Sequence, residues 1–252
     1  MNLVEYRRMY EVEESHWWYV GLHRLILAAV QRESARLGRP VKIFDAGCGT
    51  GRLCQLLSDQ GYDVSGCDAS EEALRLCRER GVSGLFSADL NTIELEAERF
   101  DIITSLDVLY HTGIHDDGAV MKRLRNALKP GGMLILNLVA FEFLRSSHDI
   151  AVHTRERYTR SMLCRRVHES GFDISFATYR VSLLFPLIAG YRLLVRSTSC
   201  RAATLNEVVS DVSSPHRLIN ALLLKTIELE NRLFELVSLP FGSSIFILAR
   251  KR

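Results

Sequence analysis

The pattern of apolar and polar positions divides the first part of the chain into alternating strands and helices. Short apolar runs typical of buried strands occupy residues 41–45, 62–68, 84–88, 100–106 and 133–139. Apolar residues at helical spacing fill the intervals at 51–60, 70–80 and 116–128. Strands that alternate with helices predict βαβ units and a parallel sheet covered on both faces.

The flanking segments extend this pattern. Residues 1–38 have helical spacing, and a helix at 158–171, a strand at 172–181, a helix at 215–239 and a strand at 243–249 follow the alternating part. About sixty residues separate the last two strands, and a structureless loop of that length is uncommon, so we predict helices there. We interpret residues 1–252 as a single domain, made of an N-terminal helical lid (1–40), a core (41–181), a helical cap (182–242) and a last strand with its tail (243–252).

A glycine-rich loop follows the first predicted strand, in the stretch VKIFDAGCGTGR. Glycines at positions 47, 49 and 51 allow sharp turns and close approach of a ligand to the backbone. The dinucleotide pattern GxGxxG would need a glycine where Arg52 stands. The carboxylate of Asp45 beside the loop favours a ligand with an ammonium group over a pyrophosphate.

Acidic residues also end the next two predicted strands. Asp68 ends the second strand, where a carboxylate can accept hydrogen bonds from ribose hydroxyls, and Asp89 follows the third. The motifs FDAGCGTG, GCDAS, SADL, FDIITSLDVLYH and LKPGGMLIL, in this order, resemble those of class I S-adenosylmethionine (SAM) dependent methyltransferases. The resemblance covers roughly residues 41–139.

This resemblance implies a Rossmann-like seven-stranded α/β sheet whose last strand is antiparallel. It implies SAM as the cofactor, with S-adenosylhomocysteine (SAH) as the product. With the neighbouring N-terminal helix included, we expect the cofactor to contact Trp18, Tyr19, Arg24, Asp45, Ala46, Gly47, Gly49, Asp68, Ala69, Ser70, Asp89, Leu90, Leu106, Asp107 and His111.

The outer segments resemble a narrower group of bacterial methyltransferases, often encoded near glycosyltransferases or other envelope and natural-product enzymes. YEVEESHWWYVGLHR, HDIAVHTRERYT and LPFGSSIFILARK carry this likeness. It implies a small-molecule acceptor, such as a natural product or a sugar- or lipid-linked intermediate. Relatives usually have Gly-Arg where this chain has Gly21-Leu22-His23-Arg24, so a basic contact is shifted or lost.

Methyl transfer is an in-line displacement, so the protein must position a nucleophile and remove its proton. Histidine suits the second task because its pKa lies near neutrality. We expect a general base among His111, His148 and His153, with Asp149 orienting one of them. The alternatives are that His111 caps a turn, that His148 and Asp149 order a loop, or that His148, Asp149 and His153 bind a metal. We expect no metal.

Acceptor contacts are expected on two segments. Arg155, Arg157 and Tyr158 follow the histidines, and their guanidinium groups suit an anionic acceptor. Trp17 is expected on the acceptor, and the Trp-Trp-Tyr run is either a hydrophobic anchor for its helix or a lid over the site.

Composition narrows the class. The net charge of +2 and the absence of an N/D-P-P-Y/F motif argue against nucleic acid as a partner. The six cysteines have no zinc spacing and fit a reducing compartment, so we expect a cytoplasmic protein. The apolar run 181–191 is too short to span a membrane. A homodimer and a membrane-surface contact through Arg192 and Arg196 stay open, as does a non-catalytic SAM-binding partner of a biosynthetic complex.

Overall fold

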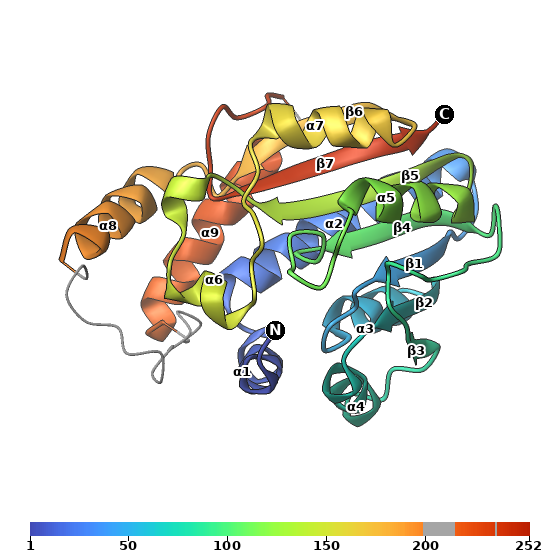
Figure 1. Cartoon of the computed structure of the whole chain (residues 1–252), viewed down its shortest axis with the longest axis horizontal. Helices are drawn as coiled ribbons and strands as arrows, with labels where there is room; N and C mark the ends of the chain where they lie inside the picture. Colours follow the sequence, from blue (N-terminus) through green and yellow to red (C-terminus); the bar gives the residue numbers. More distant parts are fainter. Residues whose placement is uncertain (199–214, 235) are drawn as a thin grey trace.

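Seven strands form one twisted sheet in the computed structural model, which describes residues 1–198, 215–234 and 236–252, with only the backbone for 193–198 (Figure 1). The strands are β1 (Lys42–Ala46), β2 (Asp63–Asp68), β3 (Leu85–Ser87), β4 (Phe100–Leu106), β5 (Leu128–Val139), β6 (Phe172–Arg180) and β7 (Ser244–Lys251). Their order is β3-β2-β1-β4-β5-β7-β6, and β7 runs antiparallel to both of its neighbours. The predicted fold class is confirmed.

Both faces of the sheet are buried, as the continuous apolar runs predict. On one face, α2 (Trp17–Leu37) and α3 (Arg52–Ser58) pack over Ile43, Ile102 and Phe246. On the other face, residues of α5 (Asp117–Ala127) and α7 (Arg160–Glu169) pack over Phe44, Ile103 and Leu134. The helix α4 (Glu71–Glu79) borders β2 and β3. This three-layer arrangement aligns the carboxyl ends of β1, β2, β4 and β5 at one edge.

The N-terminal segment is two helices rather than one. Helix α1 (Leu3–Val12) ends before residues 13–16, and His16 then begins α2 by accepting a hydrogen bond from the backbone N–H of Trp18 at 3.3 Å. Helix α2 ends at Gly38, whose left-handed φ of 65° terminates it as predicted. The break lets α1 turn away and contact α4, next to the carboxyl edge of the sheet (Figure 1).

The connection between β6 and β7 is helical where the structure describes it. It contains α8 (Phe185–Thr198) and α9 (Arg217–Leu233), and α9 packs along α2. Glu230 ties α9 to the end of β6 by accepting from the N–H groups of Val181 at 2.5 Å and Leu183 at 2.9 Å. Cys200 and the side chain of Arg196 lie outside the described residues. Within the described part of the chain, no helix is both long and apolar enough to cross a membrane.

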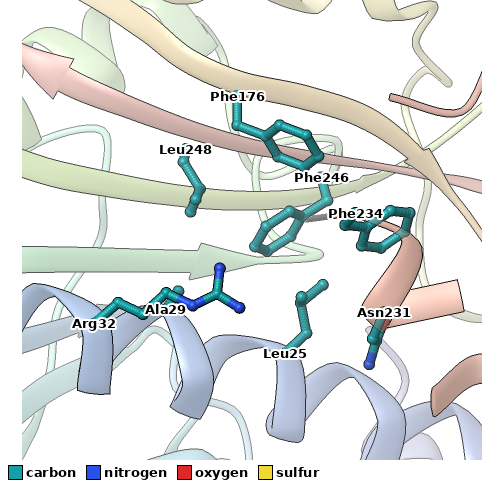
Figure 2. Close-up of a pocket in the computed structure, with 8 residues that line it drawn as sticks. All are labelled: Leu25, Ala29, Arg32, Phe176, Asn231, Phe234, Phe246 and Leu248. Atoms are coloured by element: carbon teal, nitrogen blue, oxygen red, sulfur yellow. The ribbon is translucent and has the colours of Figure 1, made fainter. Parts of the chain in front are cut away.

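A hollow of about 410 Å³ lies between α2, α9 and the β6–β7 edge (Figure 2). It is lined by Leu25, Ala29, Arg32, Phe176, Asn231, Phe234, Phe246 and Leu248. None of the motif residues that end the parallel strands lines this hollow, so we place no chemistry in it.

Candidate functional site

A second cavity, of about 870 Å³, opens at the carboxyl edge of the sheet. Residues that end β1, β4 and β5 form its floor, among them Asp45, Leu106, Asp107 and Val139. Its walls come from α1, α2, α8 and the short helix α6 (Ser147–Ala151). The position agrees with the rule that parallel sheets bind ligands beyond the carboxyl ends of their strands.

The glycine loop forms one end of this cavity. Gly47 has a φ of +88°, and a Cβ there would lie 2.3 Å from Cγ2 of Val108. Gly49 has a φ of +55°. The preceding Asp45 accepts from the hydroxyl of Thr104 at 2.6 Å, and burial raises its pKa to about 6. The loop therefore offers bare backbone beside a buried acid, as the sequence predicts.

Asp68 is the second expected cofactor residue that the structure places near the loop. Its carboxylate accepts from the N–H groups of Gly49 and Ser70, both at 2.9 Å, and from the hydroxyl of Tyr6 at 3.3 Å. Burial raises its pKa, while the hydrogen bonds oppose that change. Asp68 does not line the cavity itself, because Tyr6 of α1 lies on it. Ser70 is the N-cap of α4, and its hydroxyl accepts from the N–H of Ala73.

The residues expected to bind adenine include Asp89, which is exposed to solvent. Its carboxylate accepts from both the N–H and the side-chain amide of Asn91, at 2.9 and 2.6 Å. Leu90 is buried behind it. The roles of Ala69, Asp89 and Leu90 stay predictions. Ala46 is buried in the core and does not line the cavity.

The aromatic run of α2 lies in the cavity wall. Trp17, Trp18 and Tyr19 all line it, and the rings of Trp18 and Tyr19 meet edge to face at 5.0 Å. The guanidinium of Arg180 lies 5.3 Å from the Trp18 ring. The run thus packs at the end of the sheet and faces the cavity, and its role as a lid over a bound ligand stays a prediction.

The three candidate histidines are placed differently. His148 of α6 lines the cavity. His111 and His153 do not line it, and their rings lie 5.5 Å apart. His111 accepts from the N–H of Gly113 at 2.9 Å, which is the turn-capping alternative. Burial lowers the pKa of His111 to about 4 and lowers that of His153.

Asp149 orients an arginine rather than a histidine, which corrects the expectation. Its carboxylate accepts from Nε and Nη2 of Arg157, at 2.8 and 3.1 Å, and from the N–H of Ser146 at 2.8 Å, in a capping box. Arg157 borders the cavity, but its guanidinium group already has Asp149 as its counter-charge, so we no longer expect it to bind an anionic acceptor. Both charges are buried and bonded to each other, so this pair orders the loop.

Three further residues that were expected to contact the acceptor or the cofactor do not line the cavity. Tyr158 is fully buried and donates to Asp117 at 2.8 Å, on the α5 side of the sheet. Arg155 donates to the carbonyl of Ile114 at 2.6 Å and does not line the cavity. Arg24 projects into solvent, where it pairs with Glu228.

Two polar residues that interact with Asp107 behind the cavity lining were missed by sequence analysis. Asn137 of β5 donates to Oδ2 of Asp107 at 2.8 Å, and Arg180 lies fully buried at the end of β6. Asn137 interrupts the apolar run LILNLV, and this interruption was the available signal. Arg180 ends a strand that already contains Asp173, Ser175 and Thr178, so its position gave no such signal.

Comparisons with known proteins agree with this geometry. Residues 44–136 match the family model described as a methyltransferase domain. Over this segment the chain is similar to class I SAM-dependent methyltransferases, whose strand order its sheet shares. The matched segment runs from β1 into β5 and so includes the glycine loop, Asp68 and Asp107.

Curated relatives include two named ubiquinone biosynthesis O-methyltransferase. The protein of Idiomarina loihiensis is 28% identical over 47% of this chain and 56% of its own length. That of Pectobacterium atrosepticum is 26% identical over 69% of this chain and 86% of its own length. The chain thus spans little more than half of the first of these methyltransferases.

Solved structures share the fold. A SAM-dependent methyltransferase from Mesorhizobium loti superposes with a TM-score of 0.56 and 17% identity, over 84% of this chain and 91% of that one. A Haemonchus contortus phosphoethanolamine N-methyltransferase, solved with SAM, gives a TM-score of 0.53 and 18% identity over 84% and 49%.

The site suits the cofactor of this family. Asp68 offers a carboxylate for ribose hydroxyls, and the backbone of Gly47 and Gly49 carries no side chain to obstruct a ligand. The buried carboxylate of Asp45 lies beside these glycines in the cavity wall. These donors and acceptors fit a cationic nucleoside.

Proposed function

We propose that the protein is a SAM-dependent methyltransferase that methylates a hydroxyl group of an aromatic small molecule. The main support is that the same cavity is lined by the glycine loop and by four aromatic side chains, those of Trp17, Trp18, Tyr19 and Tyr110. Planar rings suit a planar acceptor. The O-methyltransferase names of the curated relatives support oxygen as the methylated atom.

The chain's own residues would perform binding and positioning. Asp68 accepts from the ribose hydroxyls, the loop at Gly47 and Gly49 admits the amino-acid part of the cofactor, and Leu106 lines its reactive side. Bound SAM supplies an electrophilic methyl group on a sulfonium. The aromatic wall keeps water from the acceptor. Of the three expected histidine bases, His148 keeps the support of a cavity position.

The acceptor proposed from the narrower resemblance is a natural product or a sugar- or lipid-linked intermediate. Titration calorimetry with SAH, followed by an assay of SAH release with catechol and related phenols, tests the proposal. Binding of SAH with release of product supports it. Binding without methylation of any acceptor would indicate a non-catalytic SAM-binding partner, and no binding would contradict both readings.

A further inference from the structure

Asp107 is held in an unusual backbone conformation at the end of β4. Its φ is +57°, a region that non-glycine residues rarely adopt and that costs about 1 kcal/mol or more. Its N–H donates to the carbonyl of Asn137 at 2.7 Å, which fixes this conformation. The residue lines the cavity beside Leu106 and Tyr110. Asp107 therefore borders the cavity in a conformation that the end of β4 sets.

The polar atoms around Asp107 are incompletely paired. Its Oδ2 accepts from Nδ2 of Asn137 at 2.8 Å, but its Oδ1 and Oδ1 of Asn137 are buried without a partner. An unsatisfied buried acceptor costs about 1–3 kcal/mol. Two adjacent acceptors without donors can be satisfied by a ligand that donates hydrogen bonds, and a hydroxyl group of the acceptor is such a donor.

Charges around the carboxylate come from several elements. Arg180 of β6 and Arg157 of the α6–α7 loop are its cations, and burial together with the charge of Asp107 raises the pKa of Tyr19 of α2 and of Tyr110 after β4. Arg180 is wholly buried, and its Nε and Nη1 have no hydrogen-bond partner. Burial raises the pKa of Asp107 to about 7, against the effect of Asn137 and the two arginines. A general base works best when its pKa lies near the working pH.

We propose that Asp107 takes the proton from the acceptor hydroxyl, with Asn137 positioning its carboxylate. The inference rests on the proposed function and replaces a histidine as the base. The hydroxyl proton passes to Oδ1 of Asp107. The electron pair on the acceptor oxygen forms the new bond to the methyl carbon, while the bond from that carbon to sulfur breaks with its pair staying on sulfur. The proton leaves Asp107 to solvent after the product departs.

The test compares two acceptors that differ in ionisation. Catechol keeps its hydroxyl protons at pH 8, whereas the nitro group of 4-nitrocatechol makes one hydroxyl acidic enough to be ionised already. Asp107→Asn removes the proton acceptor and keeps the shape of the side chain, and His148→Gln is the matched variant of the rival base. For each protein, kcat and KM are measured with both acceptors, and SAH affinity is measured by calorimetry.

Asp107→Asn should lower kcat with catechol by about 10²–10⁴-fold, the usual contribution of a general base. Its kcat with 4-nitrocatechol should fall less than 10-fold, and its SAH affinity should change less than about 3-fold, because neither needs the proton acceptor. If Asp107 had only a structural role, the substitution would lower kcat equally with both acceptors. His148→Gln should not show this selective loss of kcat with catechol.

The proposal is overturned if Asp107→Asn loses kcat equally with both acceptors or keeps full activity with catechol. It is also overturned if His148→Gln shows the selective loss of kcat with catechol. An unaltered protein that does not bind SAH, or that binds it and methylates neither acceptor, would instead contradict the proposed function, so the two failures are distinguishable.

Discussion

The hydroxyl of Tyr6 lies 3.3 Å from Oδ1 of Asp68, so the first helix of the chain touches the carboxylate that ends β2. Ribose hydroxyls would need this same oxygen. Cofactor binding and the position of α1 are therefore coupled through one hydrogen bond.

Tyr6→Phe should tighten SAH binding. The substitution removes a hydrogen bond that the ligand must replace, and such a bond contributes about 0.5–1.5 kcal/mol, or roughly 2- to 10-fold in affinity. Calorimetry measures the effect. Tyr10→Phe is the control on the same helix, where the ring packs under Arg80 at 4.3 Å. Weaker SAH binding by Tyr6→Phe would show that Tyr6 supports the ligand.

Asp68→Asn should weaken SAH binding by about 10- to 100-fold, because hydrogen bonds to a charged acceptor contribute about 1.5–3 kcal/mol. Asp63→Asn, at the exposed start of the same strand, should leave affinity unchanged. Equal affinities of the two variants would place the cofactor elsewhere.

Gly47→Ala should destabilise the protein and impair SAH binding together. The new Cβ would lie 2.3 Å from Val108 Cγ2, at a φ of +88°. Gly38→Ala has a similar φ of +65° but open space, so it should cost only about 1 kcal/mol and leave SAH affinity intact. Thermal unfolding and calorimetry report the two effects, and comparable costs in both variants would refute the packing argument.

Asp149→Asn should lower stability by about 3–5 kcal/mol, because it leaves the buried guanidinium of Arg157 without its counter-charge. SAH affinity of the folded protein should change little. Asp173→Asn breaks an exposed pair with Arg252 and should cost less than about 1 kcal/mol. Denaturant unfolding measures both, and a normal stability with lost turnover would return Asp149 to the catalytic residues.

Asp107→Asn should stabilise the protein, and more so at pH 8 than at pH 5.5. The pKa of Asp107 is about 7 in the fold, against about 3.9 in an unfolded chain. Between these values the unfolded chain loses its proton first, so the native protein loses stability as pH rises and the penalty is complete above pH 7. The extra gain at pH 8 should be on the order of 1–2 kcal/mol, or a few degrees in Tm. A gain that does not depend on pH would contradict the raised pKa.

The fold and the cofactor loop could be predicted because both depend on local sequence. Buried parallel strands give continuous apolar runs, and the loop at Gly47 follows its strand directly. The break between α1 and α2 was missed because residues 13–16 are polar without a glycine or proline.

Roles that depend on pairing could not be predicted from spacing. Arg157 and Tyr158 are adjacent in the chain, yet one borders the cavity and the other is bonded to Asp117 behind the sheet. Arg180 acts on Asp107 from β6, which the sheet order separates from β5 by β7, although β6 and β7 lie far apart in the sequence.

The position of β7 between β5 and β6 also determines when the sheet can be completed during synthesis. Strands β5 and β6 are held together by a strand that is synthesised more than sixty residues after β6. Until residues 244–251 leave the ribosome, the facing edges of β5 and β6 have unpaired backbone groups, which are prone to aggregation. Completion of this sheet during translation must therefore wait for the strand that is made last.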